Sequence, residues 1–127
     1  MEELIQRVTA AAGIDAGLAE KAIGMILAFI KKEAPGEEAG ALMAAMPGAE
    51  ALAEANAGGG GGMVGGLMGM MGGGGVMGLG ASLMGAGLSM GQIQGVSKEV
   101  FAFAKEKAGE DTIGAIVGSI PGLGQFV

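Results

Sequence analysis

The sequence predicts an all-α protein in which two homologous helical hairpins flank an apolar segment rich in glycine and methionine. Three observations support this fold class. Apolar residues recur at helical spacing on both sides of the chain's centre, the two sides align with each other, and the centre itself has no charged residue. We therefore divide the 127 residues into an N-terminal helical repeat (1–57), a central segment (58–85) and a C-terminal helical repeat (86–127).

The N-terminal repeat is predicted to begin with a short helix that ends at Gly13. Asp15 follows as a candidate N-cap, because its carboxylate can accept a hydrogen bond from a free backbone N–H in the first turn of the next helix. Lys31 and Lys32 lie in the last turn of that helix, where cations interact favourably with the helix dipole. Pro35 should end it.

A third helix is predicted from Glu37 to Met46, where Pro47-Gly48 interrupts it, and residues 49–57 can add one or two turns. Its apolar residues face inward in this prediction. The first repeat thus becomes a hairpin with a long arm and a short arm.

The C-terminal repeat shows the same order of signals. Ser89 and Gln92 match an S-x-x-Q capping box, and Gly109 is a predicted left-handed cap at the far end of the long helix. A shorter helix from Glu110 to Ile120 follows. One stripe runs along the long helix and contains Ile93, Val96, Val100, Phe103 and Lys107.

A shift of 74 residues aligns 12–53 with 86–127 without a gap. Eleven of the 42 pairs are identical, but eight of these are Gly or Ala and carry little weight in so biased a composition. The informative matches are Phe29 with Phe103, Lys31 with Lys105, and Pro47-Gly48 with Pro121-Gly122. We infer a duplication. Neither hairpin can bury its apolar face alone, so the two should pack on each other or on a partner chain.

The central region differs in kind from an ordinary polar linker. Residues 58–88 contain 16 glycines and six methionines, and no charged residue occurs between Glu54 and Lys98. Glycines spaced four apart would line one helix face and let another helix approach closely. The predicted interaction surface comprises the glycines Gly61, Gly65, Gly69 and Gly73 and the apolar side chains of Leu67, Met68, Met70, Met71, Met77, Leu83 and Met84.

Composition disfavours several functions. A net charge of −6 with only seven Lys and Arg disfavours nucleic acid as a partner. The chain has no His, Cys or Tyr, so acid–base catalysis would fall to carboxylates and lysines alone. The glycine runs lack the Gly-Lys-Ser/Thr ending and the preceding strand of a phosphate loop. We therefore predict no catalytic residue, no cofactor and no metal site.

Several segments together resemble the bacterial VcgC/VcgE-type family of unknown function. They are Lys31-Lys32-Glu33, the stretch ALMAAMPGAEAL from Ala41 to Leu52, the glycine-rich middle, and the restart GLSMGQIQGVSKEVFAFAKEKAGEDTIGAIVGSIPG. The resemblance covers most of the chain and implies a small helical bacterial protein. It supplies no activity, ligand or active-site residue. This chain departs from the family in that it contains more glycine and methionine.

The sequence favours a non-enzymatic protein that acts by binding to itself or to another protein. Of these two, a homo-oligomer is the expected state. The opening Met-Glu-Glu has the wrong charge for a secretory signal, so the cytoplasm is the expected compartment. Two alternatives stay open. The glycine-rich segment is long enough to insert into a membrane as a glycine zipper, and Met68, Met70 and Met71 offer soft sulfur ligands for Cu(I) or an apolar ligand surface.

Overall fold

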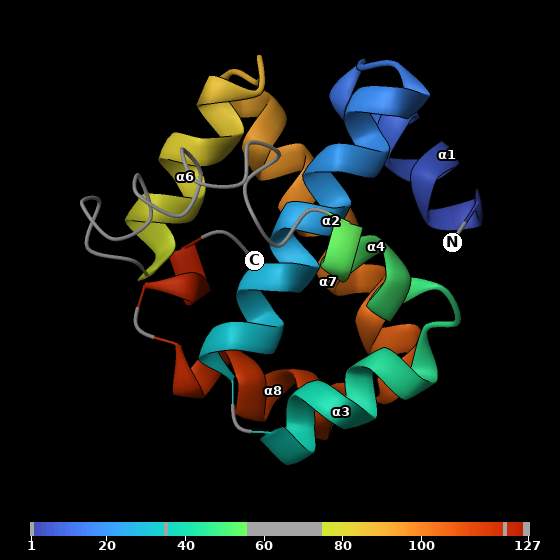
Figure 1. Ribbon diagram of the computed structural model, residues 1–127, viewed down its shortest axis with the longest axis vertical. Coiled ribbons are helices and arrows are strands. Elements are labelled where there is room, and N and C mark those ends of the chain that lie inside the picture. The colour runs from blue at the N-terminus through green and yellow to red at the C-terminus, as the bar shows by residue number, and fades with distance from the viewer. Residues whose placement is uncertain (1, 35, 56–74, 121, 126–127) are drawn as a thin grey trace.

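The computed structural model describes residues 2–34, 36–55, 75–120 and 122–125. These residues form helices and no strand, which confirms the predicted all-α class (Figure 1). In chain order the helices are α1 (Glu2–Ala12), α2 (Ala16–Glu33), α3 (Gly36–Ala45), α4 (Ala49–Ala55), α6 (Gly75–Gly85), α7 (Met90–Ala108), α8 (Glu110–Ser119) and the 3₁₀ helix η1 (Leu123–Gln125).

The helix boundaries reproduce the internal alignment. A shift of 74 residues carries α3 onto α8 without a mismatch at either end, and it carries α2 onto all but the last residue of α7. The glycines at the turns correspond as well, since Gly48 and Gly122 both have positive φ, at +89° and +85°. The two halves of the described chain therefore have corresponding helices in the same order, as a duplication requires, although the 3₁₀ helix η1 takes the place of the α-helix α4.

Helix α6 lies inside the segment that the sequence assigned to the centre. The same shift carries α1 to residues 76–86, so α6 is the counterpart of α1 in the second repeat. The second repeat therefore includes residues 75–85. The first repeat comprises α1 to α4 and the second comprises α6 to α8 with η1, so each has an opening helix before the long and short arms of its hairpin. Glycine has a low helix propensity, so the sequence pattern did not predict α6. Leu83, 1% exposed, and the partly buried Leu79 hold α6 against the core.

The first helix of each repeat packs against the long helix of the other repeat. Helix α1 lies along α7, and α6 contacts α2 as well as α7. At the other end of the molecule α3 contacts both α7 and α8 (Figure 1). The repeats thus cover each other's apolar faces, and the contacts of α1 with α7 and of α6 with α2 are reciprocal.

The core draws on matching positions of both repeats. The aligned pairs Ile26 and Val100, Leu27 and Phe101, Leu42 and Ile116, and Met46 and Ile120 are all buried. Each pair exchanges one apolar residue for another in the alignment of the two repeats. Burial of equivalent residues means that one interior is shared by the two repeats, which is why neither repeat has a complete core of its own.

The predicted N-caps are confirmed. The Asp15 carboxylate accepts the backbone N–H of Leu18 at 2.7 Å. At the equivalent position in the second repeat the Ser89 side chain accepts the N–H of Gln92, and the Gln92 side chain accepts the N–H of Ser89, so the capping box is complete.

The cap predicted at Gly109 is wrong in its geometry. Gly109 has φ +95° and ψ +154°, far from the ψ near +47° of the left-handed helical region. The cause is that α8 begins at the next residue, so Gly109 also serves as its N-cap, and N-caps take extended ψ values. Its N–H still closes α7 by donating to the Lys105 carbonyl at 2.9 Å.

Gly40 and Gly114 occupy equivalent positions inside α3 and α8, and a Cβ built at either would meet no atom within 4 Å. We expect Gly40→Ala and Gly114→Ala each to raise the free energy of unfolding by about 0.5–1 kcal/mol, because alanine loses less backbone entropy in a helix. Urea titration followed by circular dichroism measures the change. Gly13→Ala is the contrasting variant and should be destabilised, because Gly13 has φ +68°. Destabilisation of both helix variants would contradict the packing described.

Candidate interaction surface

Three of the eleven predicted interaction residues lie within the part of the chain that the structure describes. Met77, Leu83 and Met84 lie in α6. Leu83 belongs to the core, so it anchors α6 and does not contribute to an exposed surface, contrary to the sequence assignment. Met84 is 52% exposed and faces outward. The other eight lie outside the described residues: Gly61, Gly65, Leu67, Met68, Gly69, Met70, Met71 and Gly73.

Met90 is the residue that sequence reasoning missed. It is 54% exposed. Within the described residues, Met84 and Met90 are the large apolar side chains that are exposed to solvent. The two lie on either side of the turn that joins α6 to α7. The sequence carried no signal for this exposure, because Met90 lies three residues before Ile93 and so continues the spacing of the buried stripe that contains Ile93 and Val100.

Small and uncharged residues surround the two methionines. No charged side chain occurs from α6 up to Lys98, so this end of α6 and the first turns of α7 have no formal charge. We call the exposed residues of this region the uncharged face, which comprises Ala81, Ser82, Met84, Gly85, Gly87, Ser89, Met90 and Gly91. A surface of this composition can be covered without separating charged groups from water.

The corresponding helix α1 is charged and is fixed to α7 by ionic contacts. The Arg7 guanidinium donates to Glu106 at 2.8 Å and to Glu99 at 3.2 Å. It also lies 5.6 Å from the centre of the Phe103 ring, and the Lys107 ammonium lies 5.3 Å from the same ring. The hydrogen bond to Glu106, aided by the negative charges of both carboxylates and opposed by partial burial, raises the pKa of Arg7.

Arg7→Gln tests this ionic contact. The variant loses both ion pairs and the ring contact, and because these groups are partly exposed we expect the free energy of unfolding to fall by only about 1 kcal/mol. Added salt should shrink the difference between variant and wild type. Urea unfolding at low and high salt measures both effects, with Lys21→Gln on the exposed side of α2 as the control. Equal stability of Arg7→Gln and wild type at low salt would refute the stabilising role.

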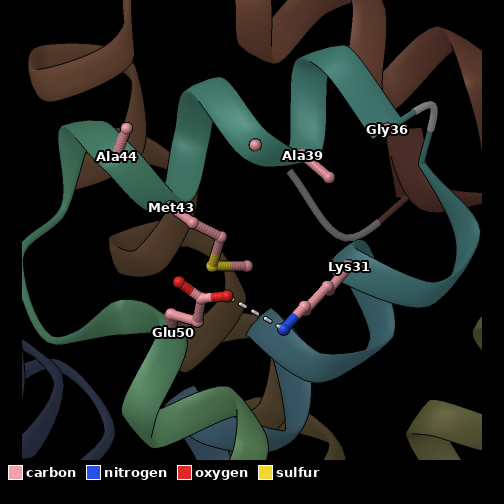
Figure 2. Close-up of a pocket in the computed structure, with 7 residues that line it drawn as sticks. Lys31, Gly36, Ala39, Met43, Ala44 and Glu50 are labelled. Atoms are coloured by element: carbon pink, nitrogen blue, oxygen red, sulfur yellow. Dashed lines mark hydrogen bonds and ion pairs between the residues drawn. The ribbon is translucent and has the colours of Figure 1, made fainter.

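A shallow groove lies where the end of α2 meets α3 and α4, with a volume of about 380 Å³. Figure 2 shows the Met43 side chain extending toward Lys31 and Glu50 across it. Lys31 Nζ pairs with the carboxylates of Glu50 at 3.3 Å and Glu54 at 3.6 Å. The remaining walls are Gly36, Ala39, Gly40 and Ala44. The charged groups at its rim already pair with one another, so they are not free to bind a ligand. We therefore take the uncharged face as the candidate interaction surface.

Two further properties concern the described part of the chain alone. It contains no group of three or more His, Cys, Asp or Glu side chains arranged to hold a metal ion. None of its helices has both the length and the apolar character needed to cross a membrane. The glycines of the predicted zipper, and Met68, Met70 and Met71, lie outside these residues.

Comparisons with protein-family models, with curated proteins and with solved structures find no match. The resemblance to the VcgC/VcgE-type family therefore stays a prediction from the sequence.

Proposed function

We propose that this protein is a non-enzymatic association module that binds a second copy of itself through the uncharged face, with the cytoplasm as its expected compartment. The observation that carries the proposal is the exposure of Met84 and Met90 on a helical surface without charge. Exposed apolar side chains that cluster on one face are typical of interaction sites, whereas scattered ones are not. Methionine suits such a surface because its flexible thioether side chain adapts to the partner.

Charge indicates which surface a second copy would use. Each chain has a net charge of −6, so two copies repel each other over most of their surfaces. At the uncharged face this repulsion is weakest, and no carboxylate has to lose its water there. Two identical acidic chains therefore meet at the lowest electrostatic cost through α6 and the start of α7.

The face is also held in place before any partner arrives. Leu83 fixes α6 to the core, and the capping box of Ser89 and Gln92 fixes the first turn of α7. A surface that is already ordered loses little conformational entropy on binding. The first repeat offers no such uncharged surface, because α1 carries the ionic contacts of Arg7 where α6 has no charged residue.

Light scattering across a range of protein concentrations tests the proposal. Wild-type protein should increase in mean mass with concentration, and Met84→Glu combined with Met90→Glu should raise the dissociation constant about 100-fold or more, because two like charges would face each other in a desolvated contact. The matched control adds the same two charges at the exposed Ala51 and Ala115. A monomeric wild type at every concentration, or equal dissociation of the control, would rule out this interface.

A further inference from the structure

The methionines of the described residues fall into two groups. Met84 and Met90 are 52% and 54% exposed, whereas Met25, Met43 and Met46 are 7%, 8% and 0% exposed. Solvent-borne reagents therefore reach the side chains of the first group more readily than those of the second. The two accessible thioethers lie on the uncharged face, while the three sheltered ones belong to the core.

A peroxide is the reagent to which a thioether is sensitive. A sulfur lone pair attacks one peroxide oxygen, the O–O bond breaks, and the departing oxygen leaves as water after taking up the proton of the transferred hydroxyl. The sulfur is oxidised by two electrons to the sulfoxide, and hydrogen peroxide is reduced by two electrons to water. The product side chain is polar and accepts hydrogen bonds, so it resists burial in an apolar contact.

We propose that Met84 and Met90 form a peroxide-sensitive modification site that switches self-association off. The effect on association rests on the proposed function, whereas the selectivity of oxidation rests on the exposures alone. Oxidation leaves the fold intact, because α6 is anchored through Leu83 and α7 is capped through Ser89 and Gln92, none of which is a methionine. Methionine sulfoxide reductases, which restore the thioether, make the switch reversible.

Peptide mass spectrometry after timed exposure to hydrogen peroxide tests the site itself. We expect Met84 and Met90 to gain one oxygen at a rate about tenfold or more above that of Met25, Met43 and Met46, with the helical circular dichroism unchanged. Equal rates in the two groups, or loss of helix as oxidation proceeds, would overturn the assignment. The exposure is made at a protein concentration below the dissociation constant, where Met84 and Met90 are accessible, so the result does not depend on whether the protein self-associates.

Light scattering of the same samples tests the switch. Peroxide should raise the dissociation constant of wild-type protein about tenfold or more, and treatment with methionine sulfoxide reductases of both epimer specificities should reverse the change. In a variant with Met84→Leu and Met90→Leu, treated and untreated samples should give the same dissociation constant, whatever its value.

Two outcomes separate the two proposals. An untreated wild type that is monomeric refutes self-association, and the mass spectra then still decide the modification site. A wild type that associates equally well before and after oxidation, or a double-leucine variant that peroxide still dissociates, refutes the switch while leaving self-association in place.

Discussion

Leu42→Ala is expected to lower the free energy of unfolding by about 2–5 kcal/mol, because it removes buried methyl groups and leaves a cavity. Leu42 has no exposed surface and belongs to α3, the helix of the first repeat that contacts both α7 and α8 of the second. Single domains are stable by only about 5–15 kcal/mol. The variant should therefore lose a large part of the total stability.

The duplication provides an internal replicate for this measurement. Ile116 is the aligned residue in α8 and is equally buried, so Ile116→Ala should lower the stability by a similar amount. Met84→Ala is the control, because it shortens an exposed apolar side chain and should change the stability by less than about 0.5 kcal/mol. Urea unfolding followed by far-ultraviolet circular dichroism measures all three. A small loss for both buried variants would mean that α3 and α8 do not share one core.

Gly95→Leu is expected to lower the free energy of unfolding by about 1–3 kcal/mol, because a large side chain would force α1 away from α7. A Cβ at Gly95 would lie 3.5 Å from the Ala11 carbonyl oxygen and 3.7 Å from the Ala12 Cα. These are ordinary contacts for one carbon, but the atoms beyond it would meet the backbone of α1. The gain in helix propensity, up to about 1 kcal/mol, offsets only part of this strain.

Two variants isolate the cause of that loss. Gly95→Ala adds only the carbon that fits, so its stability should match or exceed that of wild type. Gly114→Leu adds the same side chain as Gly95→Leu at a helix position where no atom lies within 4 Å of the new Cβ, so it should be tolerated. Equal destabilisation by leucine at residues 95 and 114 would refute the close approach of α1 to α7.

The sequence predicted the parts of the fold that depend on local signals. Asp15, Ser89 and Gln92 cap helices as expected, since side-chain hydrogen bonds to the nearest backbone groups need only a few residues of context. The alignment also identified the buried pairs, because the repeats place the same positions in the core. Which helices meet across the repeats depends on long-range packing, and no local pattern indicated that α1 lies on α7 and α6 on α2.

The candidate site was predicted less well. Glycine content weakened the helical signal of α6, and packing against the core, to which Leu79 and Leu83 contribute, overrides that preference. Leu83 and Met84 are neighbours of similar hydropathy, yet one is buried and the other exposed, which follows from the rotation of α6 against the core. Met90 was missed because its exposure depends on how α7 is oriented after the Ser89 cap. Orientation of this kind is a tertiary property.

The central claim is that the two repeats shelter each other's apolar surface, and cutting the chain between them tests it most directly. A specific protease site is placed in the full chain between Ala55 and Gly75, and the folded protein is cleaved there. We predict that the two fragments elute together on size exclusion and keep their helical circular dichroism, because the contacts of α1 with α7, α6 with α2, and α3 with α8 hold them. Fragments that elute separately, each with its helices intact, would contradict the account.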